Sequence, residues 1–250
     1  MADLSPDVTG FLIRGYGGST TVGKGLGRRT TSSSCEDDRA RESSKNGSMA
    51  TFFSSDHHFG HANIIRYCGR PYASIGEMNF HMTRRWNEVV ADDNVWYLGD
   101  FAIGDRITWP GYLAALNGRV TLVRGNHDAD PQTMLAAGFA EVCENVVVTV
   151  DGKKLWLNHF PPATEGADYK GRLGYVRPKP PASYDIALCG HVHEKWTVER
   201  ETVNVGVDRW NYRPITLAQI EAFLQSTAAY ERARLRYGSL SARAAQGQGP

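Results

Sequence analysis

The stretch TFFSSDHHFGHANII at residues 51–65 places one aspartate and three histidines directly after a short apolar run. Histidine is scarce in the chain, with eight among 250 residues. A short apolar run that ends in polar residues is typical of a buried strand in an α/β sheet, and the loops beyond such strands line the ligand crevice. We therefore interpret the stretch as a first strand that leads into a functional loop.

The same pattern, an apolar run followed by Asp, Asn or His, recurs further along the chain. The recurrences are VWYLGD at 95–100, LVRGNHD at 122–128, LWLNHF at 155–160 and IALCGHVH at 186–193. Apolar residues at helical spacing, with Pro near two of the starts, predict helices at 74–90, 107–118 and 131–139. This order predicts an α/β domain, in which five strand-end loops could converge on one place.

Two hairpins and a last helix are expected in the second half of this domain. Asp151 and Gly152 form a strong turn signal, and a second hairpin is expected at 196–207. Thr216 and Gln219 fit a capping box that opens the last helix.

Composition places the chain among ordinary globular proteins and limits its partners. Hydrophobic residues make up 41% and charged residues 22% of the sequence, and the formal net charge is +1. Without a strong overall field we expect no stable nucleic-acid partner, although a small phosphate substrate is compatible with this charge. The N-terminus lacks the pattern of a signal peptide and no apolar run approaches transmembrane length, so we expect no membrane association.

The four cysteines indicate the compartment. They are scattered along the chain and form no CxxC pair. A disulfide framework is not expected in a chain of this length, so we predict a reducing compartment, the cytoplasm.

The chain divides into three segments by composition. Residues 1–48 are rich in Gly, Ser, Thr and charge, and we expect a disordered extension there, followed by the domain at 49–228 and a flexible tail at 229–250. We hypothesise that Met49 is the true start. The stretch GSTTVGKG at 18–25 nearly fits a P-loop, but a glycine stands where the metal-binding hydroxyl is needed, so we interpret it as part of the extension.

The polar residues after the five apolar runs are good ligands for divalent metal ions. Asp56 and His58 are two positions apart, so on an extended segment they would point to the same face, and the pair His191 and His193 has the same spacing. The full set of candidate ligands is Asp56, His58, Asp100, Asn126, His159, His191 and His193. Seven ligands are too many for one tetrahedral site and fit a site with two metal ions.

These motifs, D-x-H, G-D, G-N-H-D, a later His and G-H-x-H in this order, resemble those of the calcineurin-like metallophosphoesterase superfamily. The resemblance spans roughly residues 50–217 and is strongest with small bacterial and phage members. It implies a four-layer α/β/β/α sandwich with the active site at the edges of the two sheets.

The resemblance also implies a role for each motif residue. The first metal ion would be held by Asp56, His58 and His193. The second would be held by Asn126, His159 and His191. Asp100 would bridge the two ions, and His127 would face the substrate, so these two are the catalytic candidates. The cofactors would be two divalent ions, with Mn²⁺ expected first and Fe, Zn, Ni or Co as alternatives, and a metal-bound hydroxide would attack phosphorus.

The expected reaction is hydrolysis of small phosphodiesters, with cyclic nucleotides among the candidate substrates. Phosphomonoesterase, nucleotide pyrophosphohydrolase and nuclease activities remain open, and the alternative from a different class is a non-catalytic scaffold of the same fold. The candidate substrate contacts are His61, Arg70, Arg172 and Arg209, with Arg84 also considered, since guanidinium can grip phosphate in two places. The oligomeric state is left open.

Two neighbours of the motif residues are expected to have other roles. Strand alternation turns His57 away from Asp56 and His58, so His57 is expected to pack or to contact a neighbouring loop. Asp128 is expected either to orient His127 or to cap the following helix.

Overall fold

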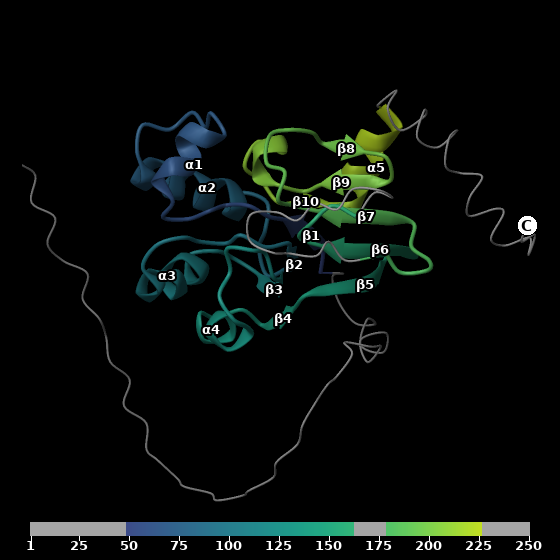
Figure 1. Ribbon diagram of the computed structural model, residues 1–250, viewed down its shortest axis with the longest axis horizontal. Helices are drawn as coiled ribbons and strands as arrows, with labels where there is room; N and C mark the ends of the chain where they lie inside the picture. Colours follow the sequence, from purple (N-terminus) through teal and green to yellow (C-terminus); the bar gives the residue numbers. More distant parts are fainter. Residues whose placement is uncertain (1–48, 163–178, 227–250) are drawn as a thin grey trace, which may run out of the picture. The chain divides into compact units, whose positions relative to one another are not determined.

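The computed structural model describes residues 49–162 and 179–226, which form a mixed α/β domain (Figure 1). The first sheet contains β1 (Thr51–Ser54), β2 (Asn94–Tyr97), β3 (Arg119–Val123), β4 (Glu141–Cys143) and β10 (Ile215–Thr216). The second sheet contains β5 (Asn145–Val150), β6 (Lys153–Asn158), β7 (Ile186–Cys189), β8 (Val198–Glu199) and β9 (Thr202–Asn204). The α-helices are α1 (Ala62–Tyr67), α2 (Ile75–Asn87), α3 (Trp109–Ala114), α4 (Pro131–Ala136) and α5 (Leu217–Ser226), and the 3-10 turns are η2 (Arg106–Thr108) and η3 (Val207–Arg209).

The first sheet is parallel except at its β10 edge. Its order is β10-β1-β2-β3-β4, and only β10 runs antiparallel to its neighbour. Parallel neighbours need a crossover, which α2, α3 and α4 supply between successive strands. These three helices pack on one face of this sheet, where Met82 and Trp86 of α2 and Met134 of α4 join a buried cluster with Tyr97.

The other face of the first sheet packs against the second sheet, whose order is β5-β6-β7-β9-β8. Side chains alternate along β1, so Phe52 belongs to the helix-side core and Phe53 to the core between the sheets. Phe53 meets Leu155 and Leu188 there, and α5 adds Leu217, Ile220 and Leu224 to the same core. The mixed α/β fold with two sheets that the resemblance implied is confirmed.

The predicted local signals are also found. The strands β5 and β6 form an antiparallel hairpin across Asp151 and Gly152, and β8 pairs antiparallel with β9. The capping box forms as predicted, because the Thr216 N–H donates to Gln219 Oε1 (2.8 Å) and the Gln219 N–H donates to Thr216 Oγ1 (3.3 Å).

Some predicted boundaries differ from the structure. The helix expected at 107–118 is divided into η2 and the shorter α3, and the Asp105 side chain caps the start of η2 by accepting from the Ile107 N–H (3.1 Å). The extension at 1–48, the tail at 229–250 and the P-loop-like stretch at 18–25 lie outside the described residues. Among the described residues, no helix combines the length and the apolar character needed to cross a membrane.

Strand direction brings the five polar loops to one place. Because β1, β2 and β3 are parallel, their carboxyl ends meet at the same edge of the first sheet. In the second sheet β6 and β7 are parallel as well. A backbone hydrogen bond from the Gly190 N–H to the His159 carbonyl (3.0 Å) ties the loops beyond these two strands together.

Candidate metal centre

Two groups of ligand side chains lie at this shared edge. Within each group, one ligand atom per residue lies within 4.8 Å of the others. The first group is Asp56, His58 and His193. The second group is Asp100, His159 and His191. Asp56 and His193 of the first group are 137 positions apart in the sequence (193 − 56), and the fold brings them together.

Asp100 lies between the two groups. Its Oδ2 atom is 3.5 Å from His58 Nε2 and 3.5 Å from His159 Nε2. The carboxylate is buried, and the charges and hydrogen bonds of the nearby histidines hold the Asp100 pKa below its usual value despite burial, which acts in the opposite direction. An ionised carboxylate in this position can interact with cations on both sides.

His159 is oriented by acceptors on both ring nitrogens. Nδ1 lies 2.7 Å from the Leu98 carbonyl and Nε2 lies 3.0 Å from Asn126 Oδ1. Both partners accept, so the ring donates twice. Burial alone would lower the His159 pKa, but the charge of Asp100, a hydrogen bond with Asp100 and the bond to the Leu98 carbonyl raise it to about 9. The Nε2 atom therefore faces both Asn126 and Asp100, where a metal ion could replace its proton.

His193 is oriented by a carboxylate that the sequence analysis did not single out. Its Nδ1 atom lies 3.3 Å from Asp208 Oδ2. Burial lowers the His193 pKa, and the hydrogen bond to Asp208 overcomes this and raises the pKa to about 11. Burial raises the Asp208 pKa, but the bonds from His193 and Arg70 bring it down to about 2.

His58 carries the clearest sign that a cation belongs here. Its ring is buried, and neither ring nitrogen has a hydrogen-bond partner. Burial holds the His58 pKa well below its usual value, so the ring is neutral between two carboxylates, Asp56 and Asp100. Buried polar atoms are nearly always satisfied, and a divalent ion would satisfy these. The nitrogen and oxygen donors fit such an ion.

The backbone that presents the ligands differs from the expected geometry. The pair Asp56 and His58 was expected to share a face because of strand alternation, but β1 ends at Ser54. Instead, five candidate ligands have left-handed backbone, with φ of 60° at Asp56, 52° at His58, 59° at Asp100, 70° at His191 and 49° at His193. Non-glycine residues rarely adopt this conformation, which concentrates at functional sites.

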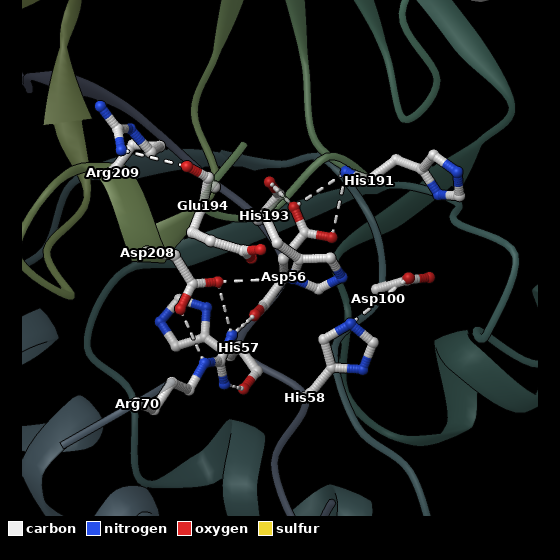
Figure 2. Close-up of polar contacts among 12 residues, drawn as sticks. Asp56, His57, His58, Arg70, Asp100, His191, His193, Glu194, Asp208 and Arg209 are labelled. Atoms are coloured by element: carbon white, nitrogen blue, oxygen red, sulfur yellow. Dashed lines mark hydrogen bonds and ion pairs between the residues drawn. The ribbon is translucent and has the colours of Figure 1, made fainter. Parts of the chain in front are cut away.

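Two motif glycines permit the close approach of these loops. A Cβ atom on Gly99 would lie 2.6 Å from both Gly125 N and His159 Nδ1. A Cβ atom on Gly190 would lie 2.5 Å from Asp56 Oδ2. Because Gly190 has no side chain, the Asp56 carboxylate can lie close to this loop. The next residue, His191, donates its N–H to Asp56 Oδ1 (3.1 Å) and Oδ2 (3.0 Å), as Figure 2 shows.

The rings of His127 and His61 both lie beside the ring of His58. The His127 side chain is exposed, its backbone N–H donates to Asp100 Oδ1 (2.9 Å), and its ring centroid is 5.4 Å from that of His58. The half-exposed His61 ring lies 5.5 Å from the His58 ring. Both imidazoles are thus near the two ligand groups without belonging to either.

The arginine candidates for substrate contact divide into separate cases. Arg70 is wrong as a substrate contact, because it is only 4% exposed and its guanidinium is bonded to Asp208 and to backbone carbonyls (Figure 2). Arg209 is exposed, and its guanidinium donates to Thr197 Oγ1 (2.6 Å) and to the Glu194 carbonyl (3.1 Å). Arg172 lies outside the described residues.

His57 packs as predicted, whereas Asp128 does neither of the things expected of it. The His57 ring is buried with Nδ1 2.9 Å from the Tyr97 hydroxyl, and burial lowers its pKa to about 3. The Asp128 carboxylate accepts from the N–H groups of Asp100 (2.9 Å), Phe101 (2.9 Å) and Gly125 (2.7 Å). It ties two loops together, and Asp130 caps α4 instead.

The profile of the calcineurin-like phosphoesterase superfamily domain matches residues 49–214. The chain belongs to this superfamily. The match covers all the predicted ligands together with His127 and Asp208.

Similar proteins come from an archaeon, a phage and a bacterium. The uncharacterized protein MJ1445 of Methanocaldococcus jannaschii is 32% identical over 181 residues, which are 68% of this chain and 89% of that protein. The Gene 66 protein of Mycobacterium phage L5 is 27% identical over 186 residues, 64% of this chain and 87% of that protein. The crystal structure of AQ665 from Aquifex aeolicus, a protein of unknown function, matches with a TM-score of 0.54 and 26% identity, over 70% of this chain and 99% of that one.

Within the superfamily domain, three supporting residues were not found by sequence reasoning. Ser55 donates to Asp56 Oδ2 (2.6 Å), Asn204 donates to the His193 carbonyl (2.7 Å), and Asp208 accepts from His193. Asp208 had one available signal, since it follows the apolar run NVGV as the motif residues follow theirs. Ser55 and Asn204 gave no signal in a single sequence.

Proposed function

We propose that this chain is a phosphoesterase that holds two divalent metal ions and hydrolyses small phosphodiesters, with cyclic nucleotides among the candidate substrates. The observation that carries the proposal is the position of Asp100, whose Oδ2 atom is 3.5 Å from a histidine of each group. A carboxylate shared by two ligand groups is what a pair of metal ions would need as a bridge.

The proposed ligands follow the two groups. The first ion would be held by Asp56, His58 and His193, the second by Asn126, His159 and His191, and both by Asp100. Manganese is our first choice, and iron, zinc, nickel or cobalt are compatible with the same donors. Such a pair of ions lowers the pKa of bound water and neutralises charge on phosphoryl oxygens.

The chain itself would supply the remaining chemistry through His127. Its exposed imidazole stands beside His58, and its backbone N–H is fixed on Asp100, so the ring can meet a phosphoryl or leaving-group oxygen. We assign it charge stabilisation and proton donation at that oxygen. His61 and Arg209 remain candidates for contacts with the substrate. We propose the cytoplasm as the compartment, as expected from the scattered cysteines.

A hydrolysis panel tests this function. Protein stripped of metal by a chelator would be loaded with Mn²⁺, Fe²⁺, Zn²⁺, Ni²⁺ or Co²⁺ and assayed on bis(p-nitrophenyl) phosphate, p-nitrophenyl phosphate, a cyclic nucleotide, a dinucleoside polyphosphate and single-stranded DNA. We expect metal-dependent cleavage that favours the small diesters and is lost in Asp100→Asn. Preference for another substrate would reassign the activity within the superfamily, and no hydrolysis with any metal would favour a non-catalytic scaffold.

A further inference from the structure

A buried ion pair lies beside the first ligand group. Arg70 Nε is 2.8 Å from Asp208 Oδ1, and Arg70 Nη2 is 2.9 Å from Asp208 Oδ2. The two side chains are 0% and 3% exposed. The pair joins the chain after α1 to the η3 turn, across 138 residues of sequence. Two-point bonding of this kind fixes both position and orientation.

The remaining donors of Arg70 hold the backbone of the first ligand loop. Nη2 donates to the Asp56 carbonyl (2.7 Å) and Nη1 donates to the His57 carbonyl (2.8 Å), as Figure 2 shows. These carbonyls belong to the segment in which Asp56 and His58 have left-handed backbone. Arg70 therefore stabilises a conformation that the local sequence disfavours.

Asp208 acts on the third ligand of the same group. Its Oδ2 atom lies 3.3 Å from His193 Nδ1, and an ionised carboxylate can only accept, so Nδ1 donates. This leaves His193 Nε2 as the nitrogen available to a metal ion. A carboxylate that orients a ligating histidine in this way is a recurrent feature of metal sites.

The second group is supported by different atoms. His159 Nδ1 is held by the Leu98 carbonyl, and the loops of Asp100 and Asn126 are tied together by Asp128. Arg70 and Asp208 make none of these bonds. The contacts that orient His159 and tie the Asp100 loop are therefore separate from those of Arg70 and Asp208, and the two groups meet where the His191 N–H donates to Asp56.

We propose that Arg70 and Asp208 form a positioning unit for the first ligand group alone, so that its loss weakens one metal position and leaves the other intact. The inference rests on the proposed two-metal function and adds an order of dependence within the site. Loss of a partner that orients a metal ligand typically lowers metal affinity by about 10–100-fold.

A competing interpretation makes Asp208 a metal ligand itself. Cys68, His193 and Asp208 form a third group of potential ligands within 4.8 Å of one another. Both Asp208 oxygens are already bonded to Arg70, which favours a positioning role. The two interpretations differ in one observable, because a site with Cys68 would have a thiolate ligand and the two proposed positions would not.

The test compares manganese binding by wild type and Asp208→Asn, using isothermal titration and metal analysis. We expect two ions in the wild type, and in Asp208→Asn one ion bound normally and one bound about 10–100-fold more weakly. Glu141→Gln is the matched control, because it removes the carboxylate of an exposed ion pair with Arg119, and it should bind as wild type does. Two ions bound with wild-type affinity by Asp208→Asn would overturn the positioning role alone. No metal bound by the wild type would contradict the proposed function itself.

Two measurements on the wild type keep the inference testable if Asp208→Asn does not fold. Nitrogen-15 NMR of the zinc-loaded protein should show His193 protonated at Nδ1 and bound to metal at Nε2, and the reverse arrangement would overturn the proposal. Cobalt-loaded protein should show no thiolate-to-cobalt absorption. Such a band, lost in Cys68→Ser and kept in Cys143→Ser, would establish the third group and remove Asp208 from its positioning role.

Discussion

At the scale of single residues, Asp100 connects the parts of the candidate centre. Its Oδ2 atom faces His58 and His159, while Oδ1 accepts from the His127 backbone N–H. Its own N–H is held by Asp128. The Asp100 side chain thus links both ligand groups to His127, the residue proposed to meet the substrate. A change at Asp100 should therefore affect metal binding, whereas a change of the His127 side chain should affect catalysis alone.

Replacing His127 should separate catalysis from metal binding. His127→Ala removes the imidazole but keeps the backbone N–H that binds Asp100, so we expect normal metal content. Loss of a general acid or of one stabilising donor should lower kcat by about 10²–10⁴-fold. Steady-state kinetics and metal analysis on the same sample check this. Hydrolysis near the wild-type rate would remove His127 from its assigned role.

At the scale of elements, the site consists of loops after parallel strands, and this much could be predicted from the sequence. Each apolar run leading into Asp, Asn or His marked a strand end correctly, because an apolar run followed by polar residues is a local signal of a buried strand and its end. The sequence did not reveal the left-handed backbone of Asp56 and His58, since it depends on loop packing. Nor did it reveal the bond between Arg70 and Asp208, because partners 138 residues apart leave no local pattern.

Asp128 gives a test of how the loops are held. Its carboxylate accepts three backbone N–H groups from two loops, and an amide at this position has only one oxygen to accept them. Asp128→Asn should therefore lower the free energy of unfolding by about 1–3 kcal/mol and also weaken metal binding.

Asp130→Asn is the matched control for this change. Asp130 is an exposed cap of α4, and Asn caps helices about as well as Asp. Urea unfolding of the two variants in the presence of chelator measures the difference. Equal stability of Asp128→Asn and wild type would mean that the loops are held by other contacts.

At the scale of the whole molecule, the candidate centre joins the two sheets. Asp56 and Asp100 follow strands of the first sheet, and His159, His191 and His193 follow strands of the second. Metal ions held by both would bind the folded chain and not the unfolded one. A ligand present at 100 times its Kd then stabilises the fold by about 2.7 kcal/mol, so melting should rise with metal concentration.

The pH dependence of metal binding follows from the two histidines with raised pKa. Burial opposes the rise, but carboxylates hold the pKa of His159 at about 9 and that of His193 at about 11. Both are protonated at pH 7 and must lose a proton to bind metal, so binding should release about two protons and tighten as pH rises. Titration calorimetry in buffers of different ionisation enthalpy measures the number. Binding without proton release would contradict the assignment of these ligands.

The same shifts predict how the protein behaves when a chelator has removed its metal. A histidine whose pKa rises on folding stabilises the fold fully below its unfolded pKa, which is about 6.5. For His159 this contribution is lost as pH rises from there through about 9. Urea unfolding in chelator should therefore show falling stability over this range, whereas unchanged stability would contradict the ion pairing of His159 with Asp100.

The proposed two-metal phosphoesterase is tested most directly by one titration of activity. Protein stripped of metal would receive Mn²⁺ in steps while the initial rate of bis(p-nitrophenyl) phosphate hydrolysis is measured. The two ligand groups on either side of Asp100 predict that the rate rises until two ions are bound per chain and then stays constant. A rate that saturates at one ion per chain, or no hydrolysis at any ratio, would contradict the account.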